Sequence, residues 1–521
     1  MLLYSNLRVA VFFYEVVMSS LSAVKAWDLE TDVLILGFGL AGASAAIEAL
    51  AADPSLKVTI CEKMPEKYAG GNSRAAGQSL LIAKNPAALI EYQRAMSTSN
   101  PIPEEMLHAW AHRMSELEPW IKERAEEAGS QYIQGTGFTD RQAVLEFPEL
   151  GAADAVTYTA TILPIPAGVW LAFKANVDKR PIEVLYETPV KDLIQDPDTL
   201  EVFGAWVERD GRLQAIKARR GVVLAVGGYE ANLEMQRNYC GYEKLYPLGT
   251  PGNTGDGIHI LQKAGADLWH MRNKGQSGGI WPGLKAPGYE TVFLRNLFWQ
   301  SFSWLEIAAD NKRFYNETAE LQLTHYKEKK HNHWVDTPHI NAGPVHMIFD
   351  ETTRSYNCLA LKAFTWNIAA EGLDWSDDNL KEIEQGRVLK ADSIEELAEK
   401  MGRDPNAVAA ELERYNQMCA QGEDTDFCRN PVTLQPIATG PFYAVEIVPA
   451  VVCTGGGGRR NIESQVLTPA GQPIPRLYEA GELGSMFSNL YQNGSYLTEA
   501  MISGRAAGRN LAKTSPWQEQ E

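Results

Sequence analysis

The sequence VLILGFGLAG at residues 33–42 decides the predicted fold of this chain. Residues 33–36 form a short, continuous apolar run, which is typical of a parallel strand buried on both faces. The glycines that follow have the spacing G-x-G-x-x-G, and the mostly small residues 43–52 predict a helix. Residues 57–61 predict a second strand, which ends at Glu62. Strand, glycine-rich turn, helix and strand together predict a βαβ unit of the Rossmann type.

The three glycines of the turn predict a dinucleotide-binding site. Gly37 permits the tight turn, Gly39 lets the backbone approach a pyrophosphate, and Gly42 lets the helix pack closely on the strand. We expect the pyrophosphate beside Leu40 and Ala41, where the helix dipole stabilises negative charge. At the end of the second strand, the carboxylate of Glu62 can accept hydrogen bonds from ribose hydroxyls. The next residue, Lys63, is also a predicted cofactor contact.

A second glycine-rich loop, GGNSRAAG at residues 70–77, selects FAD over NAD. A nicotinamide domain has no need of this loop, whereas the longer flavin needs a second backbone cradle. The cradle residues that we expect here are Gly71, Asn72, Ser73, Ala76 and Gly77.

The far end of the chain is predicted to complete the same site. Residues 476–480 predict a buried strand, and Glu482 just after it can hold ribityl hydroxyls. A final helix of small residues, 497–513, would begin close to Ser495 and Leu497, and its N-terminus can stabilise negative charge on a reduced flavin. We also expect cofactor contacts at Val190, Gly227, Gly228 and Asp256.

The middle of the chain predicts more strands and an inserted domain. Residues 183–186 and 222–226 predict strands, and residues 201–207 and 212–217 predict a hairpin around Asp210-Gly211. From about residue 270 the chain is richer in aromatic residues and local charge. There, residues 394–401 and 408–418 predict amphipathic helices, and residues 327–330 are interpreted as a solvated helix face.

The predicted fold class is therefore α/β, a bipartite Rossmann-type FAD-binding domain with an inserted α+β capping domain for the substrate. The expected bounds are an N-terminal leader at 1–29, the first FAD segment at 30–270, the cap at 271–435 and the second FAD segment at 436–515. Within the leader, the apolar residues 7–17 are too few to span a bilayer, so we expect no stable membrane span.

Composition excludes several other classes of protein. A formal net charge of -18 argues against nucleic acid or an anionic membrane surface as the main partner. The six cysteines never form C-x-x-C, which argues against an attached haem or a structural zinc site and favours a reducing compartment, the cytoplasm. The spacing of His331, His333 and His339 does not suit a metal site, and we expect none.

The chain resembles the flavoprotein family that includes soluble fumarate reductases, urocanate reductase and the 3-ketosteroid dehydrogenases. The resemblance rests on residues 32–62, 70–77, 227–228, 254–257, 312–317, 453–457 and 478–508. It implies a substrate held between the cap and the isoalloxazine. It also implies hydride transfer between flavin N5 and a carbon β to a carbonyl or carboxylate, with a side chain exchanging the α proton.

Departures from the family pattern carry the functional prediction. Residues 72–74 contain no histidine for covalent attachment, so the FAD should be non-covalent. Cys453 and Tyr491 stand where fumarate reductases have a histidine and an arginine for the substrate carboxylates, and residues 318–326 lack the proton-donating arginine. A dianion would lose its bidentate partners here. The tyrosine resembles the ketosteroid branch instead.

We therefore expect an enzyme that desaturates, or in reverse reduces, the bond α,β to a ketone of an apolar cyclic substrate such as a 3-ketosteroid. Tyr491 would polarise the ketone, although simple packing against the flavin is the alternative. Tyr326 or His325 would transfer the proton, although a surface helix is the alternative there.

Two other functions stay open. One is a fumarate-reductase-like enzyme that binds a carboxylate substrate through Arg272, Arg295 or Arg354. The other is a flavin-binding redox partner subunit, against which the predicted cap argues. The electron donor or acceptor is not indicated by the sequence.

Overall fold

The computed structural model describes residues 20–135, 143, 145–276, 281–296, 299–318, 325–361 and 373–517. The chain divides into two compact units. The described residues of Met1–Met235, Pro251–Asn273 and Cys453–Glu521 form the first, and those of Gln236–Thr250 and Lys274–Val452 form the second. No described helix is long and apolar enough to cross a membrane.

The first unit is built on a sheet whose strands come from both ends of the chain. Its order is β24-β25-β9-β1-β2-β6, with the antiparallel strands β7 and β8 continuing from β9. Central strand β1 (Leu29–Leu36) lies parallel to β2 (Val58–Cys61) and β9 (Arg212–Leu224). Strand β25 (Pro473–Glu479) lies parallel to β9 on its other side. The predicted bipartite Rossmann-type α/β fold is thereby confirmed.

The remaining strands of this sheet lie at its two margins. Strand β6 (Ile182–Leu185) pairs in parallel with β2, and β24 (Gln465–Leu467) pairs antiparallel with β25. The hairpin of β8 (Val202–Arg209) and β9 turns at Asp210-Gly211, and β7 (Val190–Gln195) pairs with β8.

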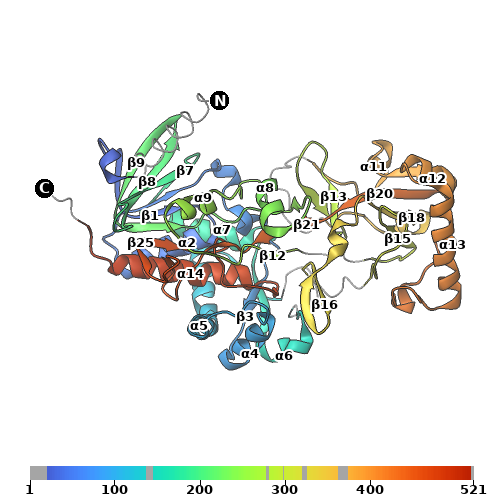
Figure 1. Cartoon of the computed structure of the whole chain (residues 1–521), viewed down its shortest axis with the longest axis horizontal. Coiled ribbons are helices and arrows are strands. Elements are labelled where there is room, and N and C mark those ends of the chain that lie inside the picture. Colours follow the sequence, from blue (N-terminus) through green and yellow to red (C-terminus); the bar gives the residue numbers. More distant parts are fainter. Residues whose placement is uncertain are drawn as a thin grey trace, which may run out of the picture. The chain divides into compact units, whose positions relative to one another are not determined.

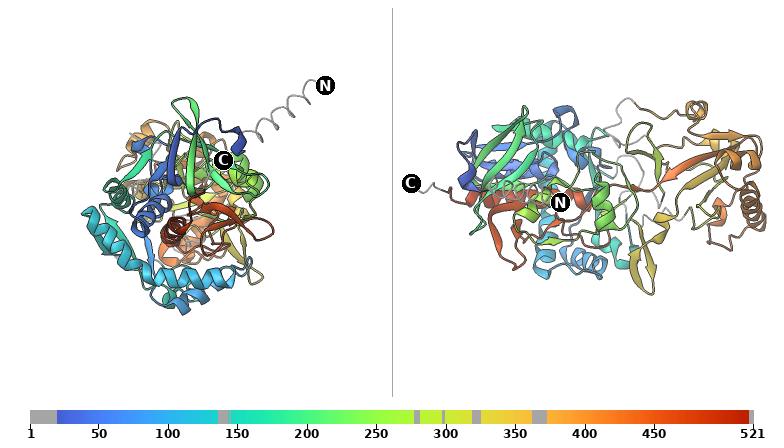
Figure 2. Two further views of the ribbon diagram at one scale, coloured as in Figure 1. Left: turned by 90° about the vertical axis from the view of Figure 1, so that its left-hand side faces the viewer. Right: turned by 45° about the horizontal axis from the view of Figure 1, so that its top comes forward.

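Two helices of small residues pack closely beside this sheet, α2 (Leu40–Ala52) and α14 (Ser495–Lys513) (Figure 1, Figure 2). A Cβ atom on Gly504 would lie 2.3 Å from the carbonyl oxygen of Ala41, and one on Gly508 would lie 2.2 Å from that of Ala45. Glycine is therefore required at both positions for this helix pair to approach so closely.

Further helices complete the first unit. These are α3 (Gly71–Ala75), α4 (Pro86–Met96), α5 (Glu104–Ala128), α6 (Ala152–Ala155), α7 (Gly168–Asp178), α8 (Leu233–Met235) and α9 (Asp256–Lys263). A small antiparallel sheet has the order β3 (Leu80–Ile82), β5 (Tyr158–Leu163) and β4 (Gln131–Gln134).

The second unit contains a six-stranded sheet. Its order is β14 (Val292–Leu294), β13 (Gly283–Lys285), β20 (Phe442–Val448), β18 (Val345–Asp350) and β15 (Trp304–Ile307), and β19 (Leu389–Ala391) also pairs with β20. Side chains alternate between two cores: Trp304 packs with Trp281 and Trp375, whereas Leu305 packs with residues of α12 (Ile394–Lys400) and α13 (Pro405–Gln421). The two amphipathic helices predicted from the sequence are confirmed.

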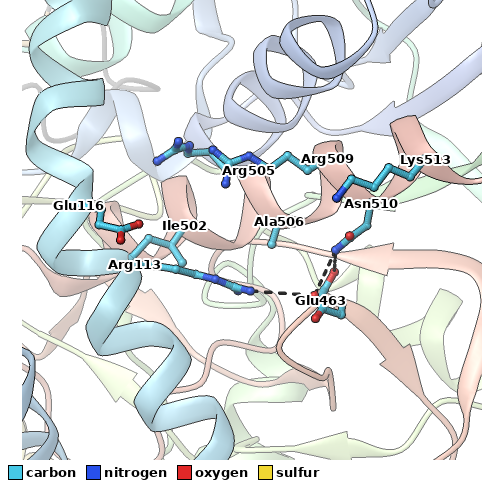
Figure 3. Close-up of a pocket in the computed structure, with 9 residues that line it drawn as sticks. All are labelled: Arg113, Glu116, Glu463, Ile502, Arg505, Ala506, Arg509, Asn510 and Lys513. Atoms are coloured by element: carbon cyan, nitrogen blue, oxygen red, sulfur yellow. Dashed lines mark hydrogen bonds and ion pairs between the residues drawn. The ribbon is translucent and has the colours of Figure 1, made fainter.

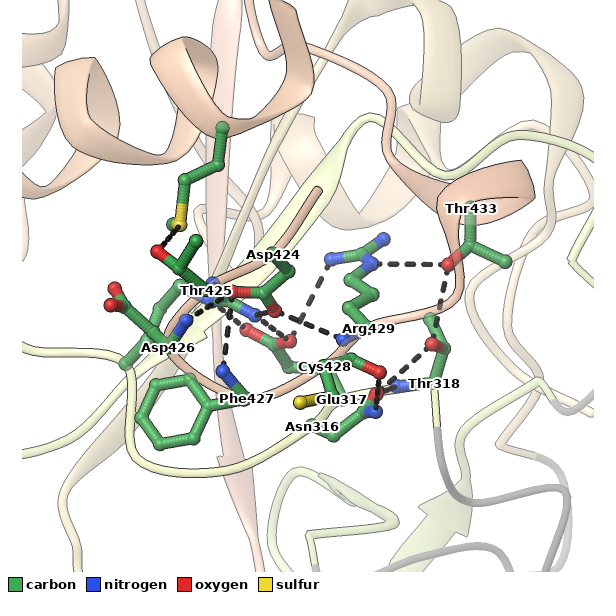
Figure 4. Close-up of polar contacts among 12 residues, drawn as sticks. Asn316, Glu317, Thr318, Asp424, Thr425, Asp426, Phe427, Cys428, Arg429 and Thr433 are labelled. Carbon is green, nitrogen blue, oxygen red and sulfur yellow. Dashed lines mark hydrogen bonds and ion pairs between the residues drawn. The ribbon is translucent and has the colours of Figure 1, made fainter. Parts of the chain in front are cut away.

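A buried ionic network holds the second unit together next to α13. Arg313 binds Glu317 through Nε at 2.7 Å and Asp424 through Nη2 at 2.9 Å, and all three side chains are fully buried. Arg429 lies 3.7 Å from Glu317 and donates to the carbonyl oxygens of Trp304 and Phe302. Figure 4 shows Glu317 meeting Asp424 and Arg429, which come from one separate loop.

The structure corrects some expected elements. Residues 327–330 are not a helix face but strand β16 (Lys327–Lys330), which forms a hairpin with β17 (His333–Asp336). Its turn residues, His331 and Asn332, both have positive φ, as the tight turns of hairpins require. Residues 222–226 are not a separate strand, because β9 continues unbroken to Leu224. The second unit also extends to Val452, past the expected boundary at 435, and includes Gln236–Thr250.

Candidate functional site

The glycine-rich turn after β1 has the geometry that its sequence predicts. Gly37 has a φ of +105°, and a Cβ atom there would lie 2.2 Å from the carbonyl oxygen of Ala225 on the neighbouring chain segment. A Cβ atom on Gly42 would lie 2.1 Å from the carbonyl oxygen of Gly37. Both glycines are needed by the protein's own packing.

Gly39 differs, because nothing in the protein itself requires glycine there. Its φ of -95° is open to any residue, and an added Cβ atom would meet only Ser73 Oγ at 3.5 Å and the carbonyl oxygen of Gly70 at 3.6 Å. The missing side chain leaves room at the N-terminus of α2, where a phosphate group can approach the backbone. The turn therefore fits a dinucleotide pyrophosphate.

Glu62 is buried at the end of β2 and stays able to accept more hydrogen bonds. Its Oε2 accepts from the backbone N–H of Phe38 and its Oε1 from that of Met64, both at 2.8 Å. Each carboxylate oxygen has further acceptor capacity, so ribose hydroxyls can still be bound. Burial raises the pKa of Glu62, and the backbone donors partly offset this effect.

Two other predicted cofactor residues bind each other. Lys63 Nζ donates to Asp256 Oδ2 at 2.7 Å and to Thr254 Oγ1 at 2.9 Å. This ion pair joins the end of β2 to the first turn of α9. Lys63 and Asp256 thus lie together in the same unit as Glu62.

The second glycine-rich loop forms the short helix α3 rather than an open loop. Ser73 Oγ accepts the backbone N–H of Leu40 at 3.0 Å, which ties this segment to the start of α2. Asn72 Nδ2 donates to Glu482 Oε2 at 2.9 Å and to Glu230 Oε1 at 2.6 Å. The first glycine turn, the second and the segment after β25 are therefore joined directly.

Glu230 was missed in the sequence, although it shares its donors with the predicted residue Glu482. It is fully buried, accepts from Asn253 Nδ2 at 2.6 Å, and accepts from the hydroxyl of Thr454 at 3.0 Å. The available signal was a carboxylate two residues after Gly228, where a parallel strand ends and ligands commonly bind. Gly228 itself has no room for a side chain, since a Cβ atom would lie 2.2 Å from Thr454 Oγ1.

The remaining predicted cofactor residues lie in the first unit. Gly227 has a φ of +75° and packs against Asn253, and Val190 begins β7. Ala76 and Gly77 directly follow α3, and Ser495 and Leu497 lie in the first turn of α14. We propose that these residues, together with the glycine turns, Glu62 and Glu482, hold the flavin.

The structure brings Tyr491 together with Tyr496 at the N-terminus of α14. Their ring centroids are 5.0 Å apart at an interplanar angle of 62°. Burial raises the pKa of Tyr491 well above its usual value, and the neighbouring Cys453, Glu146 and Glu482 raise it further. Both phenols therefore keep their protons at neutral pH, as a hydrogen-bond donor to a substrate must.

Tyr326 and His325 lie in the second unit and are buried there. The Tyr326 hydroxyl donates to the carbonyl oxygen of Ala450, and burial raises its pKa well above the usual value. His325 Nδ1 contacts the carbonyl oxygen of Gln276. The alternative of a surface helix is wrong for both, since they are only 0% and 2% exposed and have positive φ. Their role in proton transfer stays a prediction.

A separate cavity of about 410 Å³ lies between α5 and the C-terminal half of α14. Figure 3 shows Arg113 of α5 reaching Glu463, with Arg505 and Arg509 of α14 also at the cavity. Both α14 arginines bind Glu48 of α2, at 2.5 and 3.2 Å. The residues that line this cavity are mostly charged, and none of them belongs to the predicted flavin site.

Across the part of the chain that the structure describes, no group of three or more His, Cys, Asp or Glu side chains is arranged to hold a metal ion.

Comparisons with known proteins agree with this architecture. A digoxin reductase from Eggerthella lenta is 28% identical over 531 residues, covering 94% of this chain and 89% of that protein. An NADH:fumarate oxidoreductase from Klebsiella pneumoniae is 27% identical over 92% of this chain, which spans about half (48%) of that protein. The solved 3-ketosteroid delta1-dehydrogenase from Sterolibacterium denitrificans superposes with a TM-score of 0.72 at 20% identity, covering 93% of this chain and 99% of that one.

The two-segment Rossmann sheet and its pyrophosphate turn define an FAD-dependent oxidoreductase. The family model described as FAD binding domain matches residues 32–496, so the chain belongs to that family. The cofactor is FAD, as predicted.

Proposed function

We propose that this protein oxidises or reduces the CH–CH bond α,β to a ketone of an apolar cyclic substrate such as a 3-ketosteroid. The observation that carries the proposal is the pair Cys453 and Tyr491, which by the family resemblance stand where fumarate reductases have a histidine and an arginine. A dicarboxylate would meet a thiol and a phenol there, without the bidentate ion pairs that it needs. A ketone oxygen needs only a neutral donor, which a phenol supplies.

Tyr491 would act as that donor. Its raised pKa keeps the hydroxyl protonated at neutral pH, so it can donate to the ketone oxygen and stabilise the negative charge that develops when the α proton leaves. When bound, FAD supplies hydride transfer at its N5. Tyr326 or His325 would hold the α proton.

The alternative is a carboxylate substrate, for which the name of the NADH:fumarate oxidoreductase relative is the specific support. Each of the three arginines considered for such a substrate is either ion-paired within the protein or exposed. Arg295 forms a fully buried ion pair with Glu306, and Arg354 binds Glu351. Arg272 is exposed. This arrangement favours the ketone over a dicarboxylate.

Anaerobic mixing with substrate panels tests the proposal in both directions. Oxidised enzyme should bleach with saturated cyclic ketones, or chemically reduced enzyme should regain its yellow colour with the corresponding α,β-unsaturated ketones. Fumarate, acrylate and urocanate serve as the matched carboxylate panel. Flavin that responds only to carboxylates would overturn the proposal.

A further inference from the structure

Two carboxyl groups of the first unit lie side by side in the predicted flavin site. One nitrogen atom, Asn72 Nδ2, contacts Glu230 Oε1 at 2.6 Å and Glu482 Oε2 at 2.9 Å. A Cβ atom placed on Gly228 would lie 2.7 Å from Glu230 Oε2 and 2.8 Å from Glu482 Oε1. The two carboxyl groups therefore face one small space from two different chain segments.

Uncharged amides and a hydroxyl donate to these carboxyl groups. Asn253 Nδ2 and Thr454 Oγ1 donate to Glu230, and the backbone N–H of Thr454 donates to Glu482 at 3.0 Å. Such donors stabilise a single negative charge well. Two adjacent carboxylates away from bulk water repel each other strongly, and this repulsion favours a state in which the pair keeps one proton.

Other titratable groups surround the pair. Electrostatic interactions connect Tyr491 and Tyr496 with each other, with Cys453 and with Glu482. Burial is the main cause that raises the pKa values of both tyrosines, and these neighbours raise them further. On the other side, Thr254 follows Asn253 and binds the ion pair of Lys63 and Asp256. Because the tyrosines stay protonated, the charge of this cluster depends on the carboxyl pair, in which burial and mutual repulsion both favour a bound proton.

We propose that Glu230 and Glu482 share one proton beside the bound flavin, and that this proton is coupled to the charge of the flavin. This inference rests on the proposed position of Glu482 in the flavin site, but not on the identity of the substrate. Burial raises the pKa of Glu230; burial and then the charge of Glu230 raise that of Glu482. Added electrons on a nearby flavin raise the pair's pKa further, so one carboxyl group takes a proton from solvent and forms an O–H bond.

Redox titration as a function of pH tests this coupling. The pair has one pKa in the oxidised enzyme and a higher one in the reduced enzyme. Between these two pH values, the midpoint potential of the flavin should fall more steeply with pH, because one additional proton is taken up per two electrons. Glu230→Gln should move this steeper section out of that pH range to lower pH, because Glu482 then loses the neighbouring charge that helps to raise its pKa. Glu230→Asp should retain it, with shifted breaks. An unchanged slope in Glu230→Gln would overturn the proposal.

Two controls separate this result from other failures. Glu48→Gln removes a carboxylate that is ion-paired with Arg505 and Arg509 outside the site, so it should leave the slope unchanged. A chemical reductant drives the titration, so an incorrect substrate class for the enzyme cannot affect it. If Glu230→Gln loses its flavin and is colourless, the redox titration cannot be made. A second measurement, which needs no flavin, then tests the proposal.

That measurement is the pH dependence of the melting temperature of the apoprotein. The unfolded carboxyl group ionises near 4.5, whereas the folded pair holds its proton to higher pH. The folded state then binds more protons, so stability falls as pH rises from 4.5 through the folded pKa. Glu230→Gln should flatten this fall. A fall of equal size in the parent and in Glu230→Gln would show that the pair holds no extra proton.

Discussion

At the scale of single residues, the glycines of the first turn are needed for different physical reasons. Gly37 and Gly42 are required by close packing within the protein, because Cβ atoms there would lie 2.2 and 2.1 Å from carbonyl oxygens. The protein's own packing does not require glycine at position 39, so we attribute this glycine to the approach of the cofactor. Substitutions can therefore separate folding from flavin binding at this one turn.

Gly39→Val should give a folded protein without FAD. Its side chain would project where the pyrophosphate must meet the backbone, whereas its Cβ atom would meet only Ser73 and Gly70 at ordinary contact distances. The ratio of flavin to protein by absorbance checks the first part, and circular dichroism of the apoprotein checks the second. Gly42→Val is the matched comparison and should fail to fold. Full flavin content in Gly39→Val would contradict the proposed site.

Tyr491→Phe should lose roughly 100- to 1000-fold in turnover on the best ketone substrate, because a preorganised donor to a developing oxyanion is removed. The ring and its contact with Tyr496 at 5.0 Å are kept, so the variant should still fold and keep its flavin. Steady-state kinetics decide the matter. Activity within a few-fold of the parent would make Tyr491 a packing residue and leave the chemistry to Tyr326 or His325.

At the scale of helices and strands, local patterns predicted most elements but not their pairing. The βαβ unit, the Asp210-Gly211 hairpin and helices α12 and α13 follow from apolar periodicity and turn residues alone. The hairpin at 327–336 was misread, because its run of lysines resembles an exposed helix face. Lys327 is in fact 8% exposed and binds Asp336, a contact that no local pattern reveals.

The same limit applies to the candidate site. Sequence reasoning predicted Glu482 and Asn72, but their contact with Glu230 joins residues 158 and more positions apart. Burial and shared donors, which make Glu230 a functional candidate, exist only in the folded sheet. Likewise, the ionic network of Arg313, Glu317 and Asp424 was visible in the sequence only as a motif at 312–317.

That network gives a prediction for the second unit. Asp424→Ala should lower the free energy of unfolding by about 3–5 kcal/mol at pH 7, because the buried Arg313 loses one of its two carboxylate partners. Burial alone would raise the pKa of Asp424, but Arg313 and backbone donors outweigh it and lower the pKa to about 2. Its stabilisation is thus complete above the unfolded pKa of 3.8 and is lost as pH falls through 2.

Denaturant unfolding at pH 7 and at successively lower pH checks this prediction, and the parent and variant should converge toward pH 2. Asp426→Ala is the control, because Asp426 binds Arg414, whose side chain is 55% exposed. A pair with such an exposed member contributes less than about 1 kcal/mol. Equal losses in both variants would show that the buried network is no stronger than a surface ion pair.

At the scale of the whole molecule, the proposed flavin site is assembled from chain segments hundreds of positions apart. Strands β1 and β25 flank β9 in one sheet, and Asn72 reaches Glu482 across 410 positions. A ligand held by such segments binds only the folded chain, so binding and folding are linked. Free FAD at 100 times its dissociation constant should therefore stabilise the protein by about 2.7 kcal/mol.

We predict that FAD is held without a covalent bond. Because binding and folding are linked, it should then be released on unfolding. Residues 72–74 offer no histidine, and in the structure Asn72 binds two carboxyl groups while Ser73 accepts the N–H of Leu40. Acid or heat precipitation of the yellow protein should leave all flavin in the supernatant, where chromatography should identify it as FAD. The melting temperature should also rise with added FAD, as only a reversibly bound ligand allows. Flavin that stays with the washed pellet would show a covalent link, and the proposed contacts of residues 72–77 would then be wrong.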